Sequence, residues 1–302
     1  METGQEKIIQ QEIRKLFRCK VDDIRKADLG TYMDLKYFAY TEEGKFLVKL
    51  TTKYNLRGNL PDMAREIQAS GIPLHAAISS RYSTVLKRHC NAYPWLEGKT
   101  LLQMRPELAP GELAAYGEAC GKLLKRIHRF QSRYKPDKIR NPRREYRHYR
   151  FYCQLKKVDF PHKQEFDAYF QKHAQLWKGR PACFAHMDYQ PQNIMLCQDG
   201  LHIIDFESCM FTDPWMDFMS NLFFYPPEHE EFTIGLLRGY FPEGAPEEFY
   251  RVTSLMGVLA VYRYAMWKYQ KNGKMAVKNP NALYEMYDGL TNVIPANLRG
   301  KV

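Results

Sequence analysis

Residues 183–218 read CFAHMDYQPQNIMLCQDGLHIIDFESCMFTDPWMDF, and this stretch decides how the rest of the chain is interpreted. Two runs rich in β-forming residues, 193–198 and 201–206, flank Asp199-Gly200. An Asp-Gly pair between such runs predicts a β-hairpin, because both central residues of a type I′ turn have φ > 0. The stretch therefore predicts two antiparallel strands joined by a tight turn.

The predicted hairpin brings three polar residues toward one another. With that turn at its centre, Ile194 faces Asp205, Asn193 lies one step away, and Asp188 is a few residues upstream. Phosphoryl transfer uses these residue types: one Asp orients the attacking hydroxyl and takes its proton, while an amide and a second carboxylate hold Mg²⁺ against the phosphates. The alternative is a hairpin with an Asp at each end for turn and solvation reasons. The residue types, their order and the hairpin together favour phosphoryl transfer over this alternative.

The spacing H-x-D-x-x-x-x-N followed by D-F-x, which runs from His186 to Glu207, is the kinase catalytic and metal-binding signature. Together with the form IIDFE at 203–207 and DPWMDF at 213–218, it resembles the aminoglycoside phosphotransferase and choline kinase family. The resemblance implies an α+β, two-lobed protein-kinase-like fold, with a small antiparallel-sheet N-lobe and a mostly helical C-lobe. It also implies ATP and Mg²⁺ as cofactors.

The expected organisation is an N-terminal nucleotide-binding lobe over 1–93, a hinge over 94–98, and a C-terminal catalytic and substrate-binding lobe over 99–302. In the resembled family the hinge offers backbone groups to adenine. By position, the Pro94 carbonyl accepts from the exocyclic amine and the Leu96 N–H donates to the ring. Proline suits the first role, since only its carbonyl is needed.

The resemblance carries further roles over to matching positions. Asp188 is the expected catalytic base, and Asn193 and Asp205 are the expected metal ligands. Lys49, a cation within the apolar strand 46–50, resembles the lysine that contacts the α- and β-phosphates, and Glu66 on a predicted helix resembles the glutamate that pairs with it. An edge-strand lysine that faces water is the alternative for Lys49. Gly30 is the remaining glycine of the loop that covers the phosphates in the family, which makes it a cofactor-binding candidate. The same loop is equally well interpreted as an ordinary hairpin turn.

The expected activity is transfer of the ATP γ-phosphate to a hydroxyl of a small molecule, most of all an aminoglycoside-type antibiotic, which would confer antibiotic resistance. A polycationic acceptor needs carboxylates that converge on it, whereas a quaternary ammonium needs an aromatic cage. The alternative reading of these acids and aromatics is a solvated surface and a packed core. The candidate substrate residues are Glu207, Asp213, Glu228, Glu230, Glu231 and Trp267, with Glu243, Glu247, Glu248, Tyr262, Tyr264 and Tyr269 as further members of the same clusters.

Other functions remain open at this point. A metabolic kinase for a choline-like amino-alcohol or a sugar fits the same motifs, and so does a non-catalytic ATP-binding pseudokinase scaffold. The segment 122–157 carries fourteen Lys and Arg against two acids, about the whole net charge of +11, and could serve as a nucleic-acid surface. A solvated basic face that attracts anionic nucleotide is the favoured interpretation, because no nucleic-acid motif accompanies it.

Composition bounds the rest. The N-terminal segment lacks the apolar region of a signal peptide, and no apolar run is long enough to cross a bilayer, so a cytoplasmic protein without a membrane anchor is expected. The seven cysteines form no C-x-x-C pair, which suits thiols in a reducing compartment better than disulfides or zinc. His128 and His186 are expected to pack or to support the catalytic loop rather than to act as acid or base.

Overall fold

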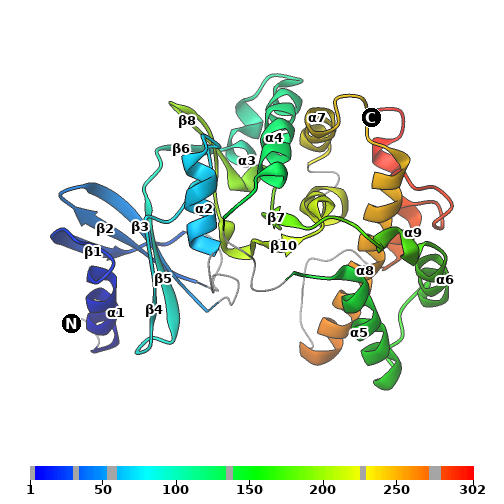
Figure 1. Ribbon diagram of the computed structural model, residues 1–302, viewed down its shortest axis with the longest axis horizontal. Coiled ribbons are helices and arrows are strands. Elements are labelled where there is room, and N and C mark those ends of the chain that lie inside the picture. Colours follow the sequence, from blue (N-terminus) through cyan, green and yellow to red (C-terminus); the bar gives the residue numbers. More distant parts are fainter. Residues whose placement is uncertain (1–3, 30–33, 53–59, 134–138, 225–228, 272–279) are drawn as a thin grey trace. The chain divides into compact units, whose positions relative to one another are not determined.

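The computed structural model describes the whole chain except residues 1–3, 30–33, 53–59, 134–138, 225–228 and 272–279 (Figure 1). Contacts divide the chain into two compact units. The first unit comprises Met1–Thr100, Gln131–Asp137 and Asn193–Ser208, and the second comprises Leu101–Phe130, Lys138–Gln192 and Cys209–Val302. This division differs from the expected one, because the hairpin that we assigned to the C-terminal lobe groups with the first unit.

The first unit is built on a five-stranded antiparallel sheet in the order β1-β2-β3-β5-β4. The strands are β1 (Val21–Lys26), β2 (Leu35–Thr41), β3 (Gly44–Thr51), β4 (Ser79–Ser83) and β5 (Arg88–Pro94).

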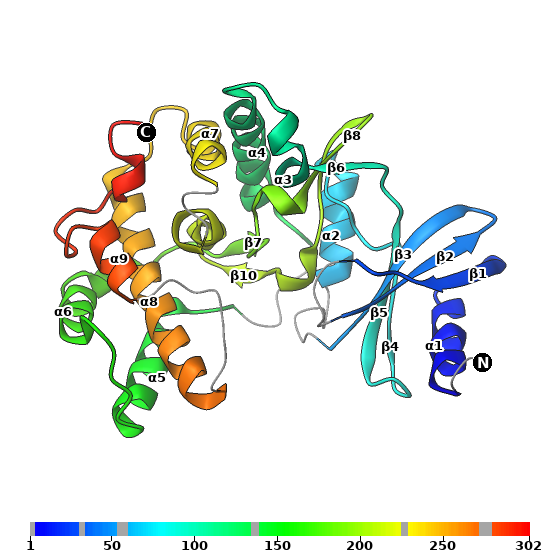
Figure 2. The ribbon, with the colours of Figure 1, turned by 180° about the vertical axis from the view of Figure 1, so that it is seen from behind.

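Helix α1 (Gly4–Arg14) buries Ile9 and Ile13 in a core with sheet residues such as Val48 and Leu50. Helix α2 (Leu60–Ala69) lies on the other side of the sheet from α1 in both views (Figures 1 and 2). Both helices are amphipathic, so each turns one apolar face inward.

A second sheet in this unit carries the predicted hairpin. Strands β8 (Ile194–Cys197) and β9 (Gly200–Ile203) pair in an antiparallel manner, and β6 (Gly98–Thr100) adds to β8. The predicted register was wrong: Cys197 pairs with Gly200, and Ile194 faces Ile203 rather than Asp205. The reason is the turn, in which Gly200 follows the two central residues with φ 121° and closes the hairpin. A glycine at the end of a turn, like one at its centre, uses a φ that other residues avoid.

Backbone hydrogen bonds join the hairpin to the rest of the first unit. The Ile203 N–H donates to the Pro73 carbonyl and the His75 N–H donates to the Ile203 carbonyl, both at 2.8 Å. Leu74 forms a parallel bridge with Ile203 and is fully buried. The segment after α2 therefore extends the hairpin sheet by one short piece of strand.

In the second unit, helices α4 (Glu112–Arg129) and α7 (Glu230–Tyr240) approach each other closely at glycines. A Cβ on Gly121 would lie 2.3 Å from the Leu236 carbonyl oxygen, and one on Gly239 would lie 2.0 Å from that of Glu118. Only residues without a Cβ permit this spacing. The buried face of α4 therefore runs through its glycines together with Leu113, Leu124 and Ile127.

The remaining elements complete the second unit. Strand β7 (Cys183–Ala185) pairs with β10 (Met210–Thr212) in an antiparallel manner. The other α-helices are α3 (Leu101–Met104), α5 (Pro142–Leu155), α6 (Lys163–His173), α8 (Glu247–Lys271) and α9 (Pro280–Met286). Among the described residues, no helix is long and apolar enough to cross a membrane. An antiparallel-sheet unit and a mostly helical unit are what the α+β, kinase-like prediction requires.

Candidate active site

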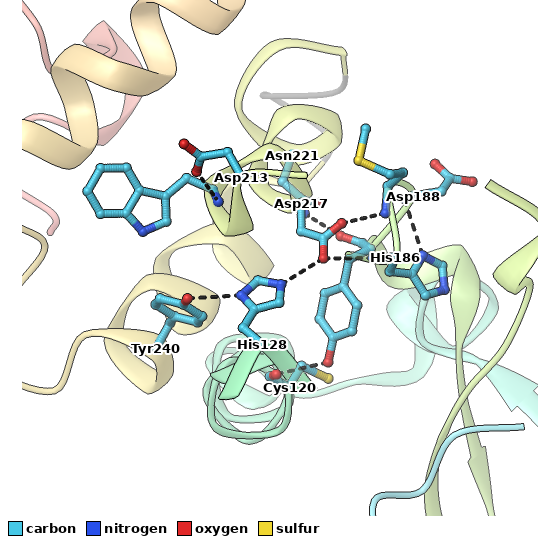
Figure 3. Close-up of polar contacts among 11 residues, drawn as sticks. Cys120, His128, His186, Asp188, Asp213, Asp217, Asn221 and Tyr240 are labelled. Carbon is cyan, nitrogen blue, oxygen red and sulfur yellow. Dashed lines mark hydrogen bonds and ion pairs between the residues drawn. The ribbon is translucent and has the colours of Figure 1, made fainter. Parts of the chain in front are cut away.

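A buried carboxylate holds the segment that follows β7. Asp217 is 1% exposed, and its side chain accepts hydrogen bonds from the backbone N–H of His186, at 2.9 Å, and from that of Met187 (Figure 3). It also lies 2.9 Å from Nε2 of His128. Because a carboxylate only accepts, Nε2 carries the proton, and Nδ1 accepts from the Tyr240 hydroxyl at 2.9 Å. Three donors therefore converge on one buried acid.

Asp188 is presented by this fixed segment. Met187, just before it, has φ 68°, a conformation that a bulky non-glycine residue adopts only where its surroundings enforce it. The Asp188 side chain accepts from Gln190 Nε2 at 2.5 Å and from Ser220 Oγ at 3.4 Å, and its backbone N–H donates to His186 Nδ1 at 3.2 Å. Both side-chain donors bind Oδ1, so the carboxylate is oriented, as a base that takes a proton in a defined direction must be.

The backbone after Asp188 is fixed as well. The Tyr189 hydroxyl donates to the Cys120 carbonyl on α4 at 2.8 Å, and Asn221 Nδ2 donates to the Tyr189 carbonyl at 2.6 Å. His229 Nδ1 lies 3.1 Å from the Asn221 side-chain oxygen. Burial raises the pKa of the Tyr189 phenol far above its usual value, so this group remains a donor. His186, expected to support the loop, does so, and His128, expected to cap or pack, is buried against Asp217.

The expected metal ligands lie in the first unit, at the open end of the β8–β9 hairpin. The Asn193 carbonyl accepts from the Ile204 N–H at 2.9 Å, so Asn193 and Asp205 are on neighbouring positions across the hairpin despite the changed register. Asp205 has φ 66°, the second strained non-glycine position at the expected site. An amide oxygen and a carboxylate are the hard oxygen ligands that Mg²⁺ prefers, so these residues fit that ion.

Lys49 on β3 contacts this end of the hairpin. Its Nζ lies 3.2 Å from Asp205 Oδ1 and 5.4 Å from the centre of the Tyr93 ring. The Lys49 side chain is 10% exposed, which excludes the alternative of an edge lysine that faces water. Burial of a cation is costly unless it is paired, so the ion pair accounts for its position.

Glu66 on α2 has other partners than the predicted one. Ser132 Oγ donates to one Glu66 oxygen at 2.5 Å, and Arg133 Nε lies 3.4 Å from the other. The pairing of Glu66 with Lys49 therefore stays a prediction, as does the role of Glu66 toward the nucleotide.

The expected hinge begins at the end of β5. Pro94 pairs with Phe46, and the next N–H, that of Trp95, donates to the Lys45 carbonyl at 2.9 Å. By the alternation of an antiparallel ladder, the Pro94 carbonyl points away from β3. It lies 2.8 Å from His75 Nε2, a contact that no pattern in the sequence indicated. Burial lowers the pKa of His75 to about 4, so the neutral ring donates its Nε2 proton to this carbonyl. The adenine-binding roles of Pro94 and Leu96 stay predictions.

The acids proposed for the substrate are mostly bound to their own chain. Asp213 is 4% exposed, bonds to the guanidinium of Arg180, and caps the Trp215 N–H at 3.0 Å. The guanidinium carbon stacks 3.6 Å from the centre of the Trp215 ring. Since this carboxylate is buried and already paired, it is a structural residue, and its assignment to the substrate is corrected here.

Some of the other candidates have partners within the chain, and others lie outside the described residues. Glu230 lies 2.5 Å from Lys301 Nζ, and Glu231 accepts from the Gly111 N–H at 2.8 Å, so both join α7 to other parts of the second unit. Tyr262, a candidate for an aromatic cage, is fully buried and donates to Asp167 at 2.6 Å, as a packed core residue would. Gly30 and Glu228 lie outside the described residues, as do the side chains of Glu207, Trp267 and Tyr269.

Part of the basic segment 122–157 is paired within the chain. Lys122 contacts Glu118, Arg140 contacts Glu145, and Arg150 contacts Asp167. Arginines on the outer face of α5 are exposed. A surface of this kind is compatible with a solvated face, and nucleic-acid binding stays an alternative.

Comparison with known proteins agrees with this geometry. A model of the phosphotransferase enzyme family, APH, matches residues 25–250. A comparison with curated proteins found no match.

Among solved structures, the chain resembles the GDP complex of aminoglycoside 2′-phosphotransferase-IIIa (TM-score 0.65, 12% identity, 96% of this chain and 97% of the other). It also resembles choline kinase LicA from Streptococcus pneumoniae (0.60, 16%, 96% and 99%) and amicoumacin kinase hAmiN in complex with AMP-PNP and Ca²⁺ (0.61, 13%, 96% and 95%). These structures share the kinase-like fold across nearly the whole chain.

The family model covers most of the chain, including the loop that presents Asp188 and the hairpin between Asn193 and Asp205, and the chain therefore belongs to the phosphotransferase enzyme family.

Proposed function

We propose that this protein transfers the γ-phosphate of ATP to a hydroxyl of a small molecule. The observation that carries the proposal is the buried Asp217. It accepts hydrogen bonds from the backbone N–H groups of His186 and Met187 and so orients Asp188, the next residue. A loop held this tightly is costly to build, because it buries a charge and keeps Met187 in a strained conformation. A protein that only bound nucleotide would have no use for it.

The residues divide the chemistry. Asp188 accepts the proton of the substrate hydroxyl and orients the hydroxyl oxygen toward the phosphorus. Lys49 neutralises phosphate charge. The amide oxygen of Asn193 and the carboxylate of Asp205 would hold Mg²⁺, which would supply neutralisation of phosphate charge. Lys49 would exchange its contact with Asp205 for phosphate oxygens.

The proposed acceptor class is a hydroxylated amine, with aminoglycosides first and amino-alcohols second. Family membership supports a small acceptor, and among the neighbours are kinases whose names specify aminoglycosides, choline and amicoumacin. An ammonium group needs carboxylates, yet Asp213, Glu230 and Glu231 are bound to their own chain. Glu207, two residues after Asp205 in the sequence, is the candidate that remains closest to the metal ligands along the chain.

The test is ADP release from ATP and Mg²⁺ with a panel of aminoglycosides, macrolides, choline, ethanolamine and sugars. Turnover with one acceptor, lost in Asp188→Ala and kept in Asp159→Ala, supports the proposal; Asp159 is an exposed acid of the same unit. Glu207→Gln then tests the amine site: a raised KM with unchanged kcat assigns it to the acceptor. Nucleotide binding without ADP release from any acceptor would favour a non-catalytic scaffold.

A further inference from the structure

The turn end of the β8–β9 hairpin gathers three side chains that bind metals. The thiol of Cys197, the carboxylate of Asp199 and the imidazole of His202 offer ligand atoms that all lie within 4.8 Å of one another. Nε2 of His202 is 2.9 Å from Asp199 Oδ1. No metal-ligand spacing in the sequence indicated this site. The three residues lie within six consecutive positions of one hairpin.

The register explains why they meet. Cys197 pairs with Gly200, and Met195 pairs with His202, so Cys197 and His202 lie on the same face as diagonal neighbours. Gly200 has no side chain to fill the space opposite the thiol. Asp199 enters from the turn itself. The observed register and the turn residue together assemble the group.

The neighbouring strand leaves the thiol open in the same way. Cys197 pairs with Gly98 of β6, and a Cβ on Gly98 would lie 2.9 Å from Cys197 Sγ. The sulfur thus lies between glycines on both neighbouring strands, and it is half-buried, whereas Cys90, Cys120, Cys153, Cys183 and Cys209 are buried.

The carboxylates near the sulfur favour the binding of a cation. Burial and the nearby carboxylates of Asp199 and Glu97 raise the pKa of the Cys197 thiol. A divalent cation removes this penalty, because it displaces the thiol proton and neutralises both acids.

We propose that Cys197, Asp199 and His202 form a binding site for a divalent transition metal of the Zn²⁺ class. One thiolate, one imidazole and one carboxylate are ligands that Zn²⁺ accepts in tetrahedral sites, with water or the Glu97 carboxylate as the fourth. Bond lengths of about 2.0–2.3 Å need ligand atoms about 3.3–3.8 Å apart, so shifts of about 1 Å complete the site. The ion would clamp the turn end of the hairpin whose other end carries Asn193 and Asp205.

Cobalt(II) tests the site directly, because a Co²⁺–thiolate bond produces a charge-transfer band in the near ultraviolet, and oxygen ligands at Asn193 and Asp205 do not. The metal-free full-length protein is titrated with Co²⁺ and then with Zn²⁺, which should displace cobalt and remove the band. Cys197→Ser should abolish the band, and His202→Gln should weaken Co²⁺ binding about tenfold or more. Cys19→Ser, at the other half-buried thiol, is the matched control and should keep the band.

A second readout guards against variants that do not fold. Co²⁺ or Zn²⁺ should raise the thermal midpoint of the wild type and of Cys19→Ser, but not that of a folded Cys197→Ser. Cobalt binding without the band, a band that survives Cys197→Ser, or a band lost in Cys19→Ser would each overturn the proposal. None of these outcomes depends on phosphotransferase activity, so the kinase proposal stands or falls separately.

Discussion

Asp217 in the second unit and Asp205 in the first are both carboxylates next to a strained non-glycine backbone, yet they are held in opposite ways. Asp217 is 1% exposed and accepts from two backbone N–H groups and His128. The Asp205 side chain is 35% exposed and its contact with Lys49 is at 3.2 Å. The first acid is enclosed by the protein, whereas the second keeps an exposed part, as the metal-binding role proposed for it requires.

The difference separates scaffolding from chemistry. A buried carboxylate whose acceptor positions are filled by its own chain can only position other groups. A partly exposed one in an ion pair retains capacity for a ligand. Asp188, oriented by Gln190 and Ser220 but only half-buried, belongs with Asp205. Two substitutions test this division directly, and a further substitution and a change of pH test the packing around it, starting with the largest effect.

Asp217→Ala should lower the free energy of unfolding by about 3–5 kcal/mol, because it leaves two backbone donors and the imidazole of His128 unpaired in the interior. Denaturant unfolding measures the loss. Asp205→Ala is the comparison from the other unit and should cost less, since its carboxylate is partly exposed and only the contact with Lys49 is removed. Equal losses in the two variants would remove the distinction drawn here.

Asp188→Ala should lower kcat about 10²-fold or more, as expected for a lost general base. Its stability and its affinity for ATP should stay near the wild-type values, because Asp188 is not expected to touch adenine or metal. Steady-state ADP release together with nucleotide titration checks both statements. A variant that keeps full turnover would show that Asp188 is not the base.

Gly121→Ala should destabilise the protein by about 1–3 kcal/mol, since the added Cβ would lie 2.3 Å from the Leu236 carbonyl oxygen and 2.7 Å from the Tyr240 N, both backbone atoms. The helices α4 and α7 must separate, which also shifts the contact between Tyr240 and His128. Thermal unfolding measures the effect, with Gly4→Ala, where nothing lies within 4 Å of the added atom, as the control.

Acidification should weaken the first unit through His75. Its pKa is about 4 in the folded protein because of burial and about 6.5 in the unfolded chain, so between these values only the unfolded state binds the proton. The free energy of unfolding therefore falls as the pH is lowered from about 6.5 to about 4, by at most about 1.4 kcal/mol per pH unit from this group. In His75→Leu the slope should be shallower, and an unchanged slope would contradict the assignment.

The local signals that carried the prediction were those of residue type and turn chemistry. The hairpin and its two strands followed from one stretch, because β-propensity and turn chemistry act over a few neighbouring residues. The roles of Asp188, Asn193 and Asp205, predicted from the same stretch, stay predictions. The register did not follow. A glycine with φ 121° can close a turn as well as form its centre, so the Asp-Gly pair alone does not fix the register.

The supporting groups were beyond reach from the sequence. His75 and Pro94, or His128 and Asp217, are brought together by folding over many intervening residues, and nothing in their own sequence surroundings indicates the partner. A signal for Asp217 was present, since it is an acid in the apolar run 214–219, where an unpaired charge would be too costly to bury.

The sequence by itself determined the fold class and the chemical character of the site, because periodicity, turns and ligand types are local properties of the chain. Tertiary structure decided which acids are buried and bonded within the protein. Asp213 and Asp217 lie on one short segment with the same chemistry, but burial against Arg180 in one case and against His128 and the loop backbone in the other makes both structural. Burial and pairing depend on residues distant in the chain, and they alone separate a carboxylate that holds the protein together from one that can bind metal or take a proton.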